Sequence, residues 1–171
     1  MSAIFSPCGF YRYRLERVIA ETGKTAFACL VNPSRAGAEV NDQTVRKLIG
    51  FGGRNGIRRW LLGNKFAGIA TDIDDLPKLT DPIGPENDIH LRAMMEEADI
   101  HVVGWGSLNK LPLSMRQRWK DIVRMADRVG VTLHCMGTNA DKHPKHPLMT
   151  GYDVPITPWE APWFPNRRNR P

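Results

Sequence analysis

The feature that most constrains the fold is a regular alternation between short apolar runs and longer segments with helix signals. Four apolar runs are rich in β-branched and aromatic residues, as expected of buried strands: 25–31 (TAFACLV), 58–67 (RRWLLGNKFA), 99–108 (DIHVVGWGSL) and 131–137 (VTLHCMG). Segments 42–56, 85–98 and 114–130 lie between them and have helical spacing or helix-start residues. We therefore expect an α/β fold, a three-layer α/β/α domain with a mainly parallel, four-stranded central sheet.

The remaining segments are expected around this sheet. Residues 11–19 (YRYRLERVI) alternate well enough for an edge strand or one arm of a hairpin. Residues 68–88 are rich in Pro, Gly and Asp and predict a long loop. Residues 138–171 contain too many prolines for regular structure, and 152–171 are expected to form a proline-rich, basic C-terminal tail. A length of 171 residues fits a single domain, 1–171.

Charge and hydropathy limit the classes of function. The net charge of +6 attracts polyanions and makes nucleic acid a reasonable partner, although an ordinary soluble basic protein carries the same charge. No apolar run approaches the roughly 20 residues of a membrane span or forms an N-terminal signal, which predicts a cytoplasmic location. Cys8, Cys29 and Cys135 are too few and too far apart for a disulfide framework or a metal site, and the last two are expected in the core.

Polar and aromatic residues gather where the predicted strands end. Parallel strands joined by right-handed crossovers end at one edge of a sheet, and ligands bind in the crevice outside that edge. The residues expected there are Asn32, Pro33, Ser34, Asn64, Lys65, Phe66, Trp105, Gly106, Thr138 and Asn139, followed by His143 and His146. Each has an ordinary interpretation as a turn, loop or core residue. Their coincidence at one edge favours a binding site.

The same residues exclude several chemistries. The glycines of 50–56 (GFGGRNG) follow a helix, so neither a Rossmann nor a P-loop context is present, and there is no Gly-x-Ser-x-Gly elbow. The prolines of KHPKHP prevent both imidazoles from sharing a helical face, and no metal site is predicted. Amides, an aromatic ring, an imidazole and basic residues suit a nucleobase and its phosphates instead.

Two families resemble this sequence. The motifs LVNPSRAG…NDQT, GNKFA, DPIGPEND, VGWG and KHPLM resemble the DUF1643 family of bacterial and phage proteins over most of the chain. More distantly, VNPS, GNKFA and KHPLM resemble three motifs of the uracil-DNA glycosylase superfamily, in the same order. That resemblance implies a DNA glycosylase, which hydrolyses the N-glycosidic bond of a flipped-out, modified or non-standard base, leaves an abasic site and needs no metal or redox cofactor. Phage DNA is one source of such a base.

The glycosylase resemblance implies two catalytic residues, and Asp42 is a third candidate because of its place in the sequence. Asn32 would hold the attacking water, and His146 would stabilise the departing base and the cationic sugar, with His143 as a rival for that role. Asp42 has an ordinary interpretation as a helix cap, but its loop follows Asn32 closely and it is expected to reach the same water.

The resemblance also implies the substrate-binding residues. Asn64 would read the edge of the base, Phe66 or Trp105 would stack on its face, and Pro33 and Ser34 would complete the first motif. Two other functions stay open: a non-catalytic nucleic-acid-binding module, and an enzyme that acts on free nucleosides or nucleotides.

Overall fold

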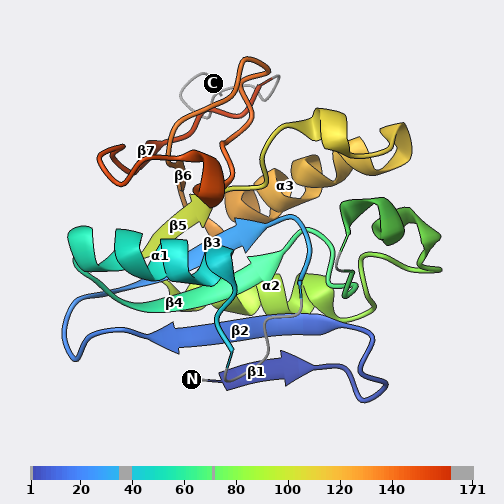
Figure 1. The fold of residues 1–171 in the computed structure, drawn as a ribbon, viewed down its shortest axis with the longest axis horizontal. Helices are drawn as coiled ribbons and strands as arrows, with labels where there is room; N and C mark the ends of the chain where they lie inside the picture. The colour runs from blue at the N-terminus through green and yellow to red at the C-terminus, as the bar shows by residue number, and fades with distance from the viewer. Residues whose placement is uncertain (1, 35–39, 71, 163–171) are drawn as a thin grey trace.

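The computed structural model describes residues 2–34, 40–70 and 72–162, which form one α/β domain around a seven-stranded sheet (Figure 1). The strand order is β1-β2-β4-β3-β5-β6-β7. The strands are β1 Ser2–Phe5, β2 Arg12–Val18, β3 Lys24–Leu30, β4 Ile57–Asn64, β5 Ile100–Val103, β6 Leu133–Cys135 and β7 Thr157–Pro158. The α-helices are α1 Gln43–Arg54, α2 Asn87–Glu97 and α3 Trp119–Val129, and the 3₁₀ helices are η1 Ile73–Lys78, η2 Leu108–Lys110, η3 Leu113–Arg118 and η4 Pro147–Met149.

The four predicted strands form the centre of the sheet. They are β4-β3-β5-β6, and each neighbouring pair among them is parallel. The expectation of a mainly parallel, four-stranded sheet is wrong at the two sides, where β2 pairs antiparallel with β4 and β7 pairs antiparallel with β6. Segment 11–19 contains a hairpin arm, β2, and the other arm, β1, is the edge strand. With only four residues, β1 is too short to show an alternating pattern.

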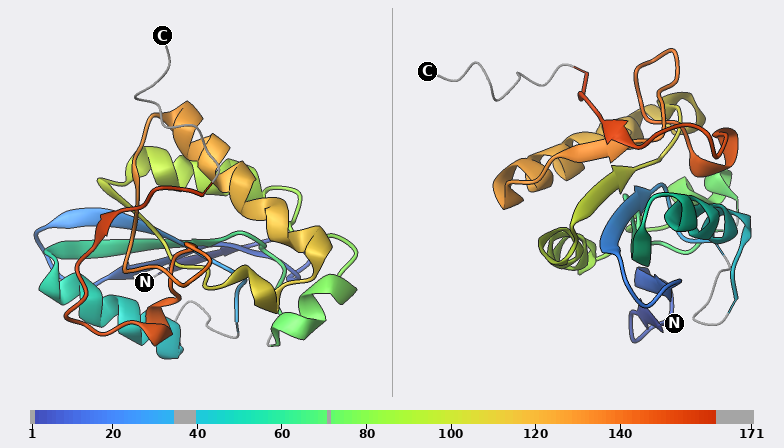
Figure 2. Two further views of the ribbon diagram at one scale, coloured as in Figure 1. Left: turned by 90° about the horizontal axis from the view of Figure 1, so that it is seen from above. Right: turned by 90° about the vertical axis from the view of Figure 1, so that its left-hand side faces the viewer.

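Helices cover both faces of the sheet (Figure 2, left). On one face α1 joins a buried cluster through Val45, Leu48 and Phe51. On the other face, residues of α2 and α3 form a second cluster, which contains Cys29 and Cys135 as predicted for core cysteines. The central strands are therefore buried on both sides, which explains their continuous apolar sequences.

Local signals set the ends of the helices. Asp42 caps α1, because its carboxylate accepts a hydrogen bond from the backbone N–H of Val45 at 2.8 Å. The helix ends at Arg54, and Gly56 follows with a φ of +64°. The predicted helix over 114–130 begins as the 3₁₀ helix η3 and is α-helical only from Trp119.

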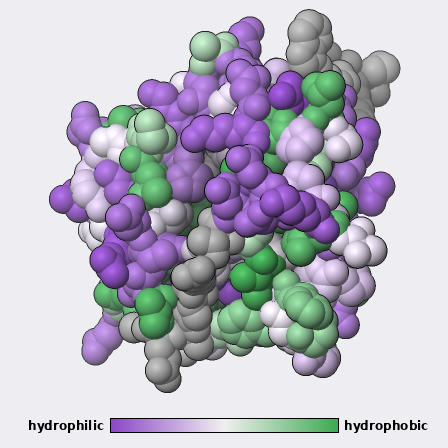
Figure 3. Space-filling model, turned by 45° about the vertical axis from the view of Figure 1, so that its right-hand side comes forward, coloured by the Kyte–Doolittle hydropathy of each residue, from purple (hydrophilic) through white to green (hydrophobic). Residues whose placement is uncertain are grey.

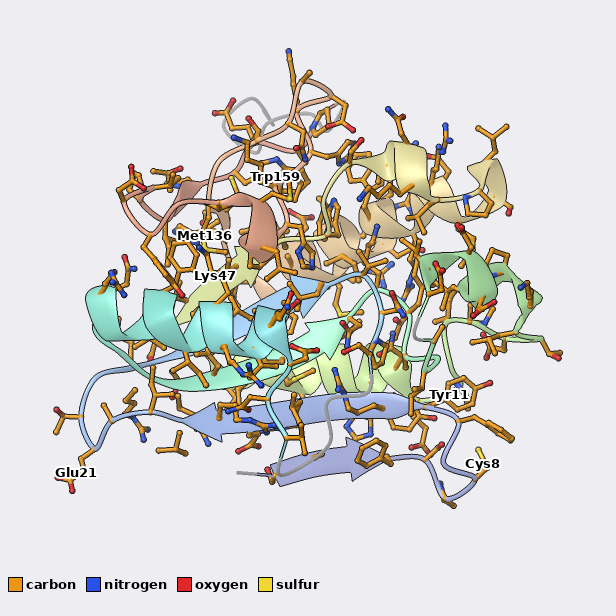
Figure 4. All side chains as sticks on the ribbon, in the orientation of Figure 1. Cys8, Tyr11, Glu21, Lys47, Met136 and Trp159 are labelled. Carbon is orange, nitrogen blue, oxygen red and sulfur yellow. The ribbon has the colours of Figure 1, made fainter. Side chains whose placement is uncertain are left out.

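The chain after β6 has more regular structure than its prolines suggested, because η4 and β7 both lie there. Trp159, labelled in Figure 4, is 7% exposed and belongs to the core cluster under α3. Its indole N–H donates to the Lys142 carbonyl at 3.0 Å. Within the predicted tail, 152–171, β7 pairs with the sheet and Trp159 packs in the core, and 163–171 lie outside the described residues.

The surface view in Figure 3 is mostly hydrophilic, with hydrophobic residues in separate patches. Exposed cations such as Arg124 and Arg128 of α3 contribute to the net charge of +6. Within the described ranges, every helix is too short or too polar to cross a membrane.

Candidate functional site

The central strands create a crevice where β3 and β5 end. These two parallel neighbours lead to opposite faces of the sheet, because β3 continues towards α1 and β5 towards α3. Because the loop after β3 and the loop after β5 run to opposite faces of the sheet, a crevice is left between them, and α/β proteins bind ligands in such crevices. The segments after β3 and β5 line a cavity of about 500 Å³. This volume falls within the ~300–1,000 Å³ that is common for small-molecule sites.

Six of the nine predicted site residues line this cavity: Asn32, Ser34, Asp42, Asn64, Trp105 and His146. They come from the loop after β3, the start of α1, the end of β4, the loop after β5 and the start of η4. Pro33, Phe66 and His143 are not among the described residues that line it. The cavity therefore brings together carboxamides, a carboxylate, an indole and an imidazole.

The carboxamide of Asn32 is fixed by the backbone around it. Its Nδ2 donates to the Ala70 carbonyl at 2.8 Å and to the Pro33 carbonyl at 3.1 Å. The same Pro33 carbonyl accepts the N–H of Ala70 at 3.3 Å, so Pro33 joins two loops. Because both protons of Nδ2 are engaged, Oδ1 is the atom of Asn32 that has capacity to accept a hydrogen bond from a ligand or water.

Asn64 is the last residue of β4 and lines the cavity. It is 2% exposed, and its Oδ1 has no hydrogen-bond partner among the described residues. An unsatisfied buried acceptor costs ~1–3 kcal/mol, so such groups are rare in native proteins. A ligand that donates a hydrogen bond to this oxygen would remove the cost.

His146 is held in one tautomer by the turn that follows it. It caps η4, and the backbone N–H of Leu148 donates to its Nδ1 at 3.4 Å. Burial lowers the pKa of His146 and outweighs the opposite effect of the nearby Asp42 charge. The ring is therefore neutral at neutral pH, with Nδ1 accepting and the remaining proton on Nε2, which is available as a donor.

Asp42 combines its capping role with a place at the cavity. One carboxylate oxygen accepts from Val45, and the other accepts a short hydrogen bond from the hydroxyl of Ser34. It is the only carboxylate among the described residues that line the cavity. The helix cap therefore puts one negative charge close to the carboxamide of Asn32.

Two predicted residues belong to the core instead. Phe66 is 2% exposed in a third apolar cluster with Leu76 and Leu111, so it does not provide a stacking surface in the cavity. His143 is 5% exposed and packs against Trp119, with ring centroids 5.0 Å apart. Of the two predicted aromatic platforms, Trp105 is the one that lines the cavity, at 3% exposure.

Lys65 is a buried cation next to this site. It is 0% exposed, its Nζ has no hydrogen-bond partner among the described residues, and it lies 5.2 Å from the Trp105 ring centroid. Burial is the main reason that its pKa falls to about 7; Cys29 opposes this effect and the Arg118 charge adds to it. The sequence placed Lys65 at a strand end without showing its burial. The burial of Lys65 could have been predicted from the alternation of side chains along a strand, because consecutive residues point to opposite faces and Lys65 therefore points away from Asn64.

Sequence reasoning missed Arg12 altogether. The register between β1 and β2 shifts between Ile4 and Phe5, whose partners are Arg14 and Arg12, so β2 has one extra residue at this point. Such bulges re-aim side chains and are frequent near binding sites. Arg12 lines the cavity at 5% exposure. Nothing in the sequence reveals the bulge, because it depends on the pairing with β1.

Within the described ranges, His, Cys, Asp and Glu do not gather in any group of three or more suited to a metal ion. The groups that line the cavity can bind a ligand by hydrogen bonds, stacking and charge.

The fold and the cavity define a single-domain α/β protein with a ligand-type site at the carboxyl edge of its parallel strands. The family model "Protein of unknown function (DUF1643)" matches residues 12–148, and the chain belongs to this family. No curated protein matches the chain, and no solved structure matches it. The resemblance to the uracil-DNA glycosylase superfamily therefore rests on the three short motifs alone.

Proposed function

We propose that this protein hydrolyses the N-glycosidic bond of a nucleotide in DNA whose base is turned out of the helix into the cavity. The observation that carries the proposal is that Asn32, Asn64, Trp105 and His146 line one cavity, although they lie in four distant segments. Enzymes that act on a base must extrude it and hold it by edge and face. The order of VNPS, GNKFA and KHPLM, similar to that in uracil-DNA glycosylases, adds support.

Asn64 and Trp105 bind the base in this proposal. The indole of Trp105, which lines the cavity, stacks on the flat ring. The buried Oδ1 of Asn64 accepts a hydrogen bond from an N–H on the edge of the base. The hydrogen bond from a matching base would satisfy this oxygen and so offset the cost of its burial.

Asn32 and Asp42 act on the water. Oδ1 of Asn32 accepts one hydrogen bond from the water and directs its lone pair at the anomeric carbon, because Nδ2 is held by two carbonyls. As the new C–O bond forms, the carboxylate of Asp42 accepts the proton that the water loses. Its negative charge also stabilises the positive charge that develops on the sugar.

His146 acts on the leaving base. When the C–N bond breaks, its electron pair goes to the base, which becomes negative. The Nε2–H of the neutral imidazole donates a hydrogen bond to the base, and this bond strengthens as the charge develops. The base finally takes a proton, so the products are an abasic sugar with a hydroxyl and the free base. The lining of the cavity by His146, and not by His143, supports His146 in this role.

The positive charge of the protein favours DNA as the partner. A net charge of +6 with exposed arginines on α3 attracts the phosphate backbone. Binding to duplex DNA should then weaken steeply with salt, because each neutralised phosphate releases counterions. An enzyme of free nucleosides would use the same cavity without that dependence on salt.

The test is release of a base from DNA. Duplexes that each carry one modified or mismatched base are incubated with the protein, treated with alkali and analysed for strand cleavage. We expect cleavage of at least one duplex, with Asn32→Ala and His146→Ala slower by ~100-fold or more while duplex binding survives.

His90→Ala is the matched control. His90 stacks on Tyr13 at 4.9 Å, outside the residues that line the cavity, and its loss should leave the rate unchanged. The proposal is wrong if no duplex loses a base, or if a duplex loses one at the same rate with Asn32→Ala and His146→Ala as with the original protein.

A further inference from the structure

A second hollow of the surface lies between α2 and α3, which cover the face of the sheet opposite α1 (Figure 2, left). Its volume is about 670 Å³. The charged residues that line it are Asp88, Arg92, Arg118, Asp121, Arg124 and Arg128. A neighbouring hollow of about 570 Å³ shares Arg118, Asp121 and Arg124 with it and adds Lys120. Because they share these residues, the two hollows adjoin, and we call them together the basic groove.

The basic groove is separate from the cavity. Ala70 and Leu111 line the cavity, whereas Phe66 and Met115 line the groove, and all four belong to the third apolar cluster. This packed cluster therefore lies between the two. The residues that act on the base and the water in the proposed reaction do not line the groove, so the groove has no part in that chemistry.

The two carboxylates of the groove neutralise its buried cation. The side chain of Arg118 is 6% exposed, and it forms ion pairs with Asp88 and, at 3.4 Å, with Asp121. Its Nε donates to the carbonyl of Lys65 at 3.0 Å, just after the end of β4. Arg118 therefore has a structural role, because it connects the start of α3 to the sheet and to α2.

The cations of α3 that remain are not neutralised in the same way. The side chain of Arg124 is 55% exposed, and its ion pair with Asp121 is of the surface kind, which contributes only ~0–1 kcal/mol. Lys120 and Arg128 form no ion pair with a described residue. An anion that enters the groove can therefore bind these three side chains at little cost in existing contacts.

These three cations form a row. Lys120, Arg124 and Arg128 are four residues apart, so they lie on one side of α3, with successive Cα atoms about 6 Å apart. The row is thus about 12 Å long, and one strand of DNA carries a phosphate every ~3.4 Å along its axis, or about three to four phosphates over this length. Arg92 of α2 is 68% exposed, pairs with Glu96 on its own helix and adds a fourth cation from the other side.

We propose that the basic groove binds the phosphate backbone of DNA, with Arg124 and Arg128 as its main contacts. This inference rests on the proposed function for the choice of DNA among polyanions. A guanidinium suits phosphate because its planar fork binds two oxygens of one group. The net charge of +6 extends the attraction beyond the groove and favours a partner with a long row of charges over a short acidic segment of a protein.

The test measures how duplex binding depends on salt. A labelled duplex of about 20 ordinary base pairs is titrated at several salt concentrations with the original protein, Arg124→Gln, Arg128→Gln and the double variant, and binding is followed by fluorescence anisotropy. Each phosphate contact contributes about 0.9 to the slope of log K against log salt, so each single variant should lower the slope by about 0.9 and weaken binding about eightfold at 0.1 M salt. The double variant should lower the slope by about twice as much.

Arg54→Gln is the matched control. Arg54 is exposed at the end of α1, on the opposite face of the sheet, and its replacement removes the same charge. It should leave the slope unchanged. The assignment is refuted if the duplex does not bind, if both groove variants keep the original slope, or if Arg54→Gln lowers the slope as much as they do. If the double variant does not fold, the single variants give the same decision.

Further measurements separate this proposal from the others. Poly-glutamate of the same total charge tests an acidic protein as the partner: tighter binding than to the duplex, lost in the groove variants, would reject DNA as the occupant. Duplex binding that depends on Arg124 and Arg128, without release of any base, would keep the groove and reject the glycosylase. Release of a base by a protein whose groove variants bind the duplex as the original does would keep the glycosylase and reject the groove.

Discussion

Replacement of Lys65 by Met should stabilise the protein, and by more at neutral than at alkaline pH. The side chain is 0% exposed, and Nζ has no hydrogen-bond partner among the described residues. Burial is the main reason that its pKa falls from 10.5 to about 7. Methionine has a similar length and flexibility without the charge, so it can fill the same space.

The size of the effect follows from the two pKa values. The interval from 10.5 to about 7 corresponds to a cost of about 5 kcal/mol for the charged form in the folded state, at ~1.4 kcal/mol per pH unit. Because the folded pKa is the lower one, the unfolded chain binds the proton more tightly, and stability rises with pH between about 7 and 10.5. The cost is about 4 kcal/mol at pH 7 and about 1 kcal/mol at pH 10.

Urea denaturation of both proteins from pH 6 to pH 10 measures this difference. Other titrating groups are common to the two proteins, so their effects cancel in the difference of the unfolding free energies. We expect the advantage of Lys65→Met to be largest at pH 6–7 and to shrink as the pH rises. Lys24→Met, at an exposed position, is the control and should change little. A difference that does not vary with pH, or a destabilised Lys65→Met protein, would refute the reasoning.

Two further predictions concern packing and acid stability. In Gly23→Ala the new Cβ would lie 2.5 Å from the backbone oxygen of Gly56, at a φ of +124° that L side chains rarely adopt, which should cost ~1–3 kcal/mol; an unchanged thermal midpoint would contradict this. Burial lowers the pKa of His101, His143 and His146, so the unfolded chain binds protons that the folded chain does not, and stability should fall as the pH drops below about 6.5. Thermal unfolding at pH 7.5 and 5.5 tests this, and equal midpoints would count against it.

The sequence predicts those parts of the fold in which several consecutive residues share one property, such as an apolar side chain. The four central strands are covered on both faces, so each is a continuous apolar run that stands out from its surroundings. The outer strands β1 and β7 have four and two residues, too few for a pattern, and they exist because a neighbouring strand offers a free edge. Their formation depends on tertiary pairing that no local window contains.

The same distinction explains which site residues are predictable. Topology alone brings Asn32, Asn64 and Trp105 to one edge of the sheet, so a correct order of strands and helices was enough to find them. The direction in which each side chain points could not be predicted from the order of strands and helices alone.

At the end of β4, three consecutive residues go to three surroundings: Asn64 to the cavity, Lys65 beneath Trp105 and Phe66 to the third core cluster. The sequence indicates where a strand ends. The face of the sheet towards which each of the last residues points depends on the exact position at which the regular alternation of side chains ends. Arg12 is the strongest case, since one extra residue in β2 decides which face of the sheet its side chain is on. Deletion of Tyr13, the extra residue, would leave Arg12 opposite Phe5 and on the same face, whereas a regular register that pairs Phe5 with Tyr13 would turn Arg12 to the other face of the sheet.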